Sequence, residues 1–316
     1  MDAIAALLDG PRAQGAFLLR SLLEPPWSLR IQDGAPLSVV AMMRGTAWVV
    51  PDTGPPTRLG PGDVAVFGRS DPYTVADDPA TVPQVVIHPG QRCTTVDGAD
   101  LKQAMDLGVR TWGNSPHGST VLMCGTYQMV GEVGERLLRA LPPLVVLPSD
   151  AWHCPVLPLL EVEIVKDDPG QQAVLDRLLD LLLIAVLRAW FARPEARAPA
   201  WYQAQTDPVV GTALRLLHHH PERPWTVAGL AATTGVSRAA LARRFTALVG
   251  EPPMAYLTGW RLALAADLLR AADATVDAVA RQVGYGSGFA LSAAFKRVRG
   301  ISPSAYRATP LPAGHS

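Results

Sequence analysis

The C-terminal third of the chain contains two copies of one pattern, about 50 residues apart. The pairs at an offset of 50 are Phe245 with Phe295, Gly250 with Gly300, Pro253 with Pro303, Ala255 with Ala305 and Tyr256 with Tyr306. The pairs at an offset of 49 are Val227 with Val276, Leu230 with Val279, Ala231 with Ala280 and Gly235 with Gly284. Because insertions are tolerated in turns, the one-residue slip is compatible with two copies of one supersecondary unit.

Each copy predicts a short helix, a glycine turn and a second helix. The predicted caps are Thr226 and Ser237 in the first copy (helices 227–234 and 238–249) and Thr275 and Ser287 in the second (helices 276–283 and 288–299). Gly235 and Gly284 suit the positive φ of the turns. The pattern is typical of two helix-turn-helix units, 226–249 and 275–299, whose second helices enter the major groove.

Helical spacing separates a core face from an outward face on each second helix. We expect the core positions to be Leu241, Phe245 and Leu248 in the first copy and Leu291, Phe295 and Val298 in the second. The expected DNA-facing residues are Ser237, Arg238, Ala239, Ala242, Arg243 and Thr246, then Ser287, Phe289, Ser292, Lys296 and Arg297. Arg243 suits a guanine edge or a phosphate, and Lys296 a phosphate. The alternative is that these charges are ordinary solvated helix residues.

These motifs resemble a known family over residues 207–316. The segments that carry the resemblance are 225–231, 237–245, 250–256, 260–265, 283–287, 294–297 and 300–307. They are similar to the DNA-binding domain of the AraC/XylS transcriptional regulators. The resemblance implies two helix-turn-helix units joined by a long helix, here around 253–269, that read successive major-groove segments. Double-stranded DNA is the implied partner, with RNA polymerase for an activator. Family members usually carry Arg where this chain has Ala293, which implies weaker readout by the second unit.

The N-terminal half predicts short β-strands separated by Gly and Pro turns. The apolar runs are 39–43, 47–50, 64–67 and 85–87, followed by 120–127. This spacing is typical of a sandwich or small barrel. The expected fold class is therefore a multidomain α+β protein. It has an N-terminal cupin-like β-barrel, linker or dimerisation helices, and a C-terminal all-α domain with two helix-turn-helix units.

The segments 45–50 and 59–67 resemble the cupin-type effector domain found in one branch of the AraC-like family. Enzymatic cupins place His and Glu ligands on an early strand and a further His after the Pro-Gly-Asp turn. Here strand 36–43 has neither residue type, and Tyr73 stands where the later His is expected. We therefore expect no catalytic residues, no metal and no cofactor, and a protein that is not an enzyme. A catalytic cupin tethered to DNA is the alternative.

A helical pattern begins at Gln171 and continues to Ala192. It is apolar on more than one face, which suggests packing between domains or on a second copy of the chain. The expected organisation is a cupin-like regulatory domain over 1–170, a helical dimerisation segment and linker over 171–206, and the DNA-binding domain over 207–316. We expect a homodimer through 171–192, with packing inside one chain as the alternative.

Charge is distributed unevenly along a chain of net charge +0. Residues 1–170 contain 12 basic and 19 acidic residues, whereas 207–316 contain 12 basic and 6 acidic, a net +6. A polyanion partner is therefore expected only for the C-terminal part. The chain has three cysteines without CxxC spacing, and its start (Met1–Ala5) lacks a basic export segment. It also has no long apolar run. We therefore expect a cytoplasmic protein without a membrane span.

The effector of the N-terminal domain is a small molecule of unknown identity in this interpretation. The aromatic residues Trp27, Trp48, Phe67 and Tyr73 are its candidate binding residues, with ordinary core packing as the alternative. A second hypothesis is a redox- or electrophile-sensing regulator acting through Cys93, together with Cys124. The segment 88–92 before Cys93 is basic and would lower the pKa of its thiol. The alternative is that the free cysteines are small buried hydrophobes.

Overall fold

The computed structural model describes residues 17–68, 70–127, 131–196, 198–271 and 273–309. Residues 1–16 lie outside it, including the segment Met1–Ala5 on which the predicted cytoplasmic location partly rests. Contacts divide the chain into two units. We call them the sheet unit (within 12–129 and 141–196) and the helical unit (within 130–140 and 197–312). Residues 130–140 thus belong with the helical unit, although the sequence placed them in the N-terminal domain.

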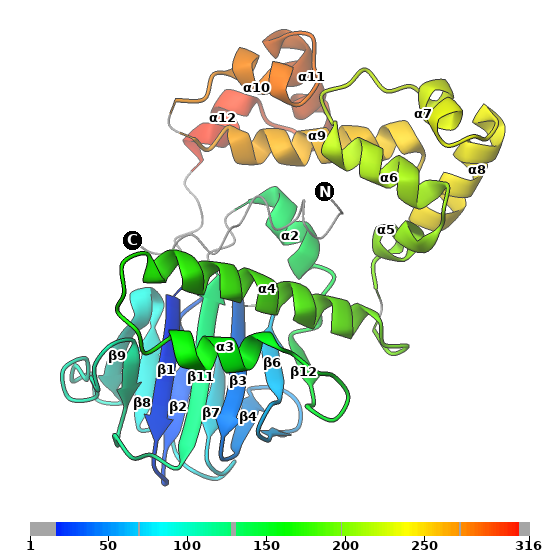
Figure 1. Ribbon diagram of the computed structural model, residues 1–316. Coiled ribbons are helices and arrows are strands. Elements are labelled where there is room, and N and C mark those ends of the chain that lie inside the picture. The colour runs from blue at the N-terminus through cyan, green and yellow to red at the C-terminus, as the bar shows by residue number, and fades with distance from the viewer. Residues whose placement is uncertain (1–16, 69, 128–130, 197, 272, 310–316) are drawn as a thin grey trace. The chain divides into compact units, whose positions relative to one another are not determined.

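The sheet unit contains two six-stranded sheets (Figure 1). Sheet A has the order β10-β1-β11-β3-β6-β12, and sheet B the order β5-β4-β7-β2-β8-β9. The strands of sheet A are β1 (Phe17–Leu23), β3 (Leu37–Arg44), β6 (Val64–Phe67), β10 (Thr111–Gly113), β11 (Thr120–Tyr127) and β12 (Leu144–Leu147). Those of sheet B are β2 (Ser28–Ile31), β4 (Ala47–Pro51), β5 (Thr57–Leu59), β7 (Tyr73–Ala76), β8 (Val85–His88) and β9 (Arg92–Thr95). The short 3₁₀ helix η1 (Pro89–Gln91) connects β8 to β9.

One apolar core lies between the two sheets. Met42 and Leu122 of sheet A belong to the same core cluster as Val49 and Val75 of sheet B. The five predicted strands are confirmed, as is the mixed cupin architecture, but the described strands form two separate sheets and not a closed barrel. The chain turns just before β6, where the Asp63 amide donates to the Gly60 carbonyl at 3.0 Å. Gly62 has a positive φ of 83°, and the Asp63 carboxylate accepts the amide of Gly60 at 2.7 Å.

Two helices of the sheet unit, α3 (Val156–Glu163) and α4 (Gln171–Phe191), pack on each other. Leu179 of α4 lies so close to Gly125 of β11 that a Cβ there would be 2.8 Å from it, and the Tyr127 hydroxyl donates to the Leu179 carbonyl at 2.7 Å. Packing inside the unit therefore accounts for most of the apolar surface of α4, which the sequence assigned to a separate dimerisation segment. Only Val174 and Leu181 remain as exposed large apolar residues of this helix.

The helical unit carries the repeat recognised in the sequence. Its elements are α2 (Glu132–Leu138), α5 (Ala200–Gln203), the 3₁₀ helix η2 (Ala204–Thr206), α6 (Val210–His219), α7 (Val227–Thr233), α8 (Arg238–Val249), α9 (Pro253–Leu268), α10 (Val276–Gln282), α11 (Gly288–Arg299) and α12 (Pro303–Ala308). Helix α9 joins two apolar cores: Tyr256 and Leu257 pack with α6–α8, whereas Leu262 and Leu269 pack with α10 and α11.

The predicted helix caps and glycine turns are confirmed in both copies of the repeat. The four predicted caps each accept the amide hydrogen bond three residues later, and Gly235 and Gly284 adopt φ values of 71° and 87°. Two core assignments are wrong, because Leu248 is 39% exposed and Val298 is 57% exposed. The helix turns these positions outward after the buried Phe245 and Phe295. No helix in the described part of the chain is long and apolar enough to cross a membrane.

Replacing the cap of α10 tests the importance of these local rules. Thr275→Ala removes the oxygen that accepts the Ala278 amide at 3.2 Å. We expect the free energy of unfolding to fall by about 1 kcal/mol, measured by urea denaturation. Thr275→Ser keeps the acceptor and is the matched control. Equal stability of the alanine and serine variants would contradict this role.

Candidate DNA-reading surface and effector cavity

Helix α8 presents the first candidate DNA-reading surface. Leu241 and Phe245 are fully buried, which fixes the rotation of the helix about its axis. The positions that this leaves exposed are Ser237, Arg238, Ala239, Arg243 and Thr246, with Ala242 half-buried beside them. No hydrogen bond or ion pair of Arg243 is found within the described residues. Its guanidinium is therefore available for a base edge or a phosphate.

Helix α11 presents the second surface, with different chemistry. Buried Leu291 and Phe295 orient it, and the amide of Gly288 is held by the Asp277 carboxylate at 2.8 Å. The exposed candidates are Ser287, Phe289, Lys296 and Arg297, with Ser292 half-buried. Phe289 is 85% exposed, an unusual state for an aromatic side chain. Ala293 is exposed where α8 has Arg243, so this surface lacks the corresponding bidentate donor.

Two further arginines of these helices are already paired. Arg244 of α8 contacts the Asp207 carboxylate at 2.6 Å, and the same carboxylate accepts the amide of Val210 at the start of α6. Arg299, the last residue of α11, pairs with Glu132 of α2. Pairing distinguishes them from Arg243, Lys296 and Arg297, none of which has an ion-pair partner in the described part of the chain.

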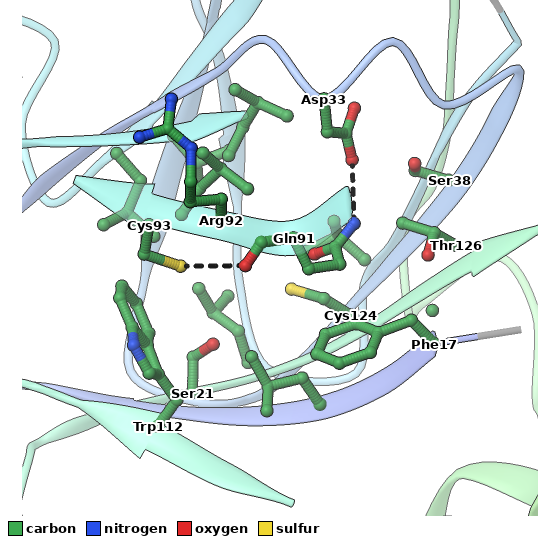
Figure 2. A pocket seen from close by; sticks show the side chains of 18 of the residues that line it. Phe17, Ser21, Asp33, Ser38, Gln91, Arg92, Cys93, Trp112, Cys124 and Thr126 are labelled. Atoms are coloured by element: carbon green, nitrogen blue, oxygen red, sulfur yellow. Dashed lines mark hydrogen bonds between the residues drawn. The ribbon is translucent and has the colours of Figure 1, made fainter. Parts of the chain in front are cut away.

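The sheet unit encloses a cavity of about 480 Å³ (Figure 2). Its wall is mainly apolar, with residues such as Leu19, Leu122 and Trp112. Polar groups occur at several points, among them Ser21, Asp33, Gln91 and Thr126, and the Gln91 amide donates to the Asp33 carboxylate at 3.4 Å. A cavity of this size with a mainly apolar surface and several polar groups has the character of a small-molecule site.

The predicted effector residues do not all line this cavity. Tyr73 lies in its wall, whereas Trp27, Trp48 and Phe67 are not among its lining residues. Phe67 stacks on Tyr73 with ring centroids 3.8 Å apart, and Trp27 is 2% exposed in the core between the sheets. The physical reason is that large aromatic rings fill space. Trp27 and Phe67 belong to the apolar core between the sheets, whereas Trp48 is half-buried.

Comparisons with known proteins agree with this geometry. Residues 2–192 match a family described as Cupin, and residues 230–309 match one described as Helix-turn-helix domain. A putative AraC-like transcription regulator from Streptomyces lividans is 36% identical over 289 residues, which cover 90% of each chain. The chain belongs to the AraC-like transcription regulators. A second such regulator, from Streptomyces antibioticus, is 33% identical over 90% of this chain and 91% of its own length.

Among solved structures, the DNA-binding domain of AdpA in complex with a target DNA is 39% identical. It covers 32% of this chain and 91% of that chain, with a TM-score of 0.30. The two similar Streptomyces proteins are named as regulators and not as enzymes. This AraC-like protein is therefore a transcription regulator with a cupin domain and a helix-turn-helix DNA-binding domain. Within the described residues, no group of three or more His, Cys, Asp or Glu side chains is arranged to hold a metal ion.

The two candidate redox cysteines of this AraC-like regulator both line the cavity. The expectation of a lowered thiol pKa is wrong. Burial, with a smaller contribution from Asp100, raises the pKa of Cys93 to about 11, and burial raises that of Cys124 to about 12. Neighbouring strand residues point to opposite faces, so the side chains of Arg92 and Cys93 diverge (Figure 2). The basic segment therefore does not stabilise the thiolate.

Most of the cavity wall was missed in the sequence, although a signal was present. Phe17, Leu19 and Ser21 alternate along β1, and Leu122, Cys124 and Thr126 alternate along β11. Every second residue of a strand faces the same side of its sheet. Alternation therefore identifies two rows that face one space once the strands are known to be neighbours. That pairing, which aligns Leu19 with Cys124, is a property of the fold.

The raised pKa of Cys93 gives a direct chemical test. A raised thiol pKa leaves the group protonated at neutral pH, and the thiolate forms only as the pH rises toward about 11. A shift from 9.0 to about 11 lowers the thiolate fraction about 100-fold. We expect iodoacetamide to alkylate Cys93 at pH 7.5 at least that much more slowly than a free thiol, as followed by mass spectrometry. Fast alkylation in the folded Cys124→Ser variant would contradict this environment.

Proposed function

We propose that this AraC-like regulator reads a two-part site in duplex DNA and that a small molecule in the cavity of the sheet unit controls the output. The observation that carries the proposal is the pair of exposed surfaces on α8 and α11, each oriented by a buried core. A regulator of this kind acts where the chromosomal DNA is, in the cytoplasm. Control by an effector is thermodynamic linkage, because the ligand favours the conformation that it binds more tightly.

The two surfaces have unequal roles in this proposal. Arg243 reads a base edge from α8, because an arginine can donate two parallel hydrogen bonds to guanine. Phe289 and Ala293 of α11 offer apolar contacts that suit a thymine methyl group, while Lys296 and Arg297 bind phosphates. The α8 half of the DNA site is therefore more strictly specified than the α11 half. The remaining predicted DNA contacts support these side chains at the edges of the two surfaces.

The ligand of the cavity is a small, largely apolar molecule with a few hydrogen-bonding groups. The wall matches this chemistry, since most of its surface is apolar and polar side chains such as Asp33 and Gln91 can bind the polar groups of a ligand. A sensor that works through thiolate chemistry at Cys93 is less well supported, because the raised pKa keeps this thiol protonated. Where the output is activation, RNA polymerase is the further partner.

Selection from a random DNA library with the purified full-length chain tests the proposal. We expect a motif with two elements about 10 bp apart, the stricter of which depends on α8. The selection is repeated after mild oxidation and after reduction. A motif that changes on oxidation would favour cysteine sensing over small-molecule control. If no sequence is enriched in either state, the proposed DNA readout by α8 and α11 is rejected.

Arg243→Ala tests base readout at one position. We expect the variant to lose about 1–3 kcal/mol of binding free energy on the selected DNA and to relax preference at a single base pair. The measurement is fluorescence anisotropy with the selected duplex and with duplexes changed at each position. An equal loss on all duplexes would instead show that Arg243 contacts only the phosphate backbone.

We also infer that two copies associate through the exposed apolar row of α4. Val174 and Leu181, which are 43% and 51% exposed, are seven residues apart and therefore on one face of the helix. Leu181→Glu places a charge in this row, and we expect it to convert a dimer into a monomer in size-exclusion chromatography with light scattering. Ala173→Glu, exposed on α4 outside the row, is the control. A dimer that survives Leu181→Glu would place the interface elsewhere.

A further inference from the structure

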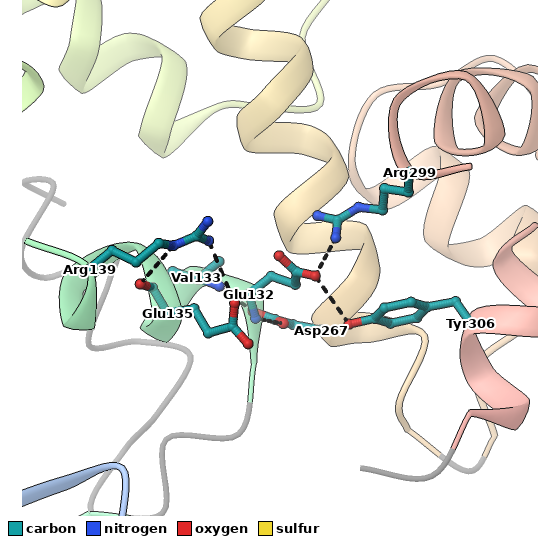
Figure 3. Close-up of polar contacts among 7 residues, drawn as sticks. All are labelled: Glu132, Val133, Glu135, Arg139, Asp267, Arg299 and Tyr306. Atoms are coloured by element: carbon teal, nitrogen blue, oxygen red, sulfur yellow. Dashed lines mark hydrogen bonds and ion pairs between the residues drawn. The ribbon is translucent and has the colours of Figure 1, made fainter. Parts of the chain in front are cut away.

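One helix of the helical unit, α2, comes from near the end of the N-terminal half of the sequence. Helix α2 lies between β11 and β12 along the chain, and both strands belong to sheet A. Its contacts, however, group residues 130–140 with the DNA-binding helices. We call residues 131–139 the latch segment. Its neighbours in the helical unit are α9 and the ends of α11 and α12 (Figure 3).

The start of α2 is held by a carboxylate from α9. Asp267 accepts the amide of Glu132 at 2.6 Å and that of Val133 at 3.2 Å, so both of its oxygens bind the free first turn of the helix. The preceding residue is Gly131, where a Cβ would lie 2.6 Å from the Asp267 carboxylate. A glycine therefore permits this close approach. The Val133 side chain is 1% exposed, which adds a buried apolar contact.

The side chain of Glu132 extends this contact to the second helix-turn-helix unit. Its carboxylate pairs with the Arg299 guanidinium and accepts a long hydrogen bond of 3.5 Å from the Tyr306 hydroxyl. The Glu132 and Arg299 side chains are only 19% and 20% exposed. Arg299 also lies near the rings of Phe295 and Tyr306, at 5.2 Å and 5.9 Å. The charge at the end of α11 is thus neutralised by a residue of the latch segment.

Arg299 is close in helical position to the DNA-facing residues of α11. It lies seven residues after Ser292, which is two helical turns along the same edge of the predicted surface. An unpaired arginine there adds one positive charge for a DNA phosphate, whereas an arginine paired with Glu132 adds none. We propose that the docked latch segment is an autoinhibitory contact that withholds Arg299 from DNA and that its release strengthens DNA binding.

The contact is built in a way that allows release. Burial raises the pKa of the Asp267 carboxyl to about 6, although the two amide hydrogen bonds act in the opposite direction. At neutral pH the docked carboxylate is therefore ionised at a desolvation cost, which offsets part of the hydrogen-bond gain. Among the described side chains, the other attachments are the ion pair with Arg299, the long hydrogen bond from Tyr306 and the buried Val133.

The test compares two charge removals on the same helix in the full-length protein. Glu132→Gln removes the partner of Arg299, and Glu135→Gln removes an equal charge from an exposed residue that pairs with Arg139 within the latch segment. Binding is measured by anisotropy over a range of salt concentrations. Two duplexes of equal length are used, one carrying the selected motif and one of random sequence.

We expect Glu132→Gln to bind both duplexes roughly 3- to 10-fold more tightly at low salt. The slope of log affinity against log salt should steepen by about 0.9, the contribution of one additional phosphate. Glu135→Gln should stay within about twofold of the natural protein, with an unchanged slope. Adding Arg299→Gln to the Glu132→Gln variant should remove the gain. Hydrogen exchange should show loss of amide protection in α2 for Glu132→Gln and not for Glu135→Gln.

Two results would overturn the latch. Equal affinities and slopes for the two single variants would show that Arg299 is not withheld, and weaker binding by Glu132→Gln would show that the docked segment supports DNA binding. The inference rests on the proposed function only in that the helical unit binds DNA. The random duplex and the hydrogen-exchange experiment distinguish failure of the latch proposal from failure of the proposed sequence-specific DNA readout. Absence of a selected motif rejects sequence-specific readout, while a steeper salt slope on random DNA still supports the latch.

Discussion

Helix α9 belongs to two apolar cores at once, and the arrangement of the DNA-reading helices depends on this. Tyr256 and Leu257 are buried with α6–α8, and Leu262 and Leu269 are buried with α10 and α11. Because a helix is stiff along its axis, two cores that share one helix cannot rotate freely against each other. The spacing of the two surfaces is therefore a property of the packing of α9. The carboxylate that receives the latch segment, Asp267, is carried by the same helix.

The sheet unit contains both a filled apolar core and an open cavity. Aromatic rings such as Phe67 and Trp27 are buried in the core between the sheets, whereas Phe17 and Trp112 line the cavity. Strand β11 belongs to the sheet unit, and the chain that follows it enters the helical unit. Leu122, Cys124 and Thr126 line the cavity, and the chain then continues into the latch segment after three further residues. Only a short stretch of chain therefore separates β11 from Glu132, which pairs with Arg299 of the second helix-turn-helix unit.

The features that sequence reasoning recovered are those decided by local interactions. Hydroxyl caps such as Thr226 and Ser287, and glycines at positive φ, depend on residues within a few positions, so the repeat and its helices were readable. Leu248 and Val298 were misassigned because one helical step decides between burial and exposure. The cavity, the burial that raises the Cys93 pKa and the place of α4 all depend on strand pairing, which residue patterns do not contain.

The latch contact has a consequence for the order in which the protein is made. Glu132 and Asp267 are 135 residues apart in the chain. At about 5–20 residues per second, a ribosome adds Asp267 roughly 7 to 27 s after Glu132. All strands of both sheets, and α3 and α4, have been synthesised by then. Each newly made molecule therefore passes through a period in which α2 is present and its docking partner on α9 has not yet been synthesised.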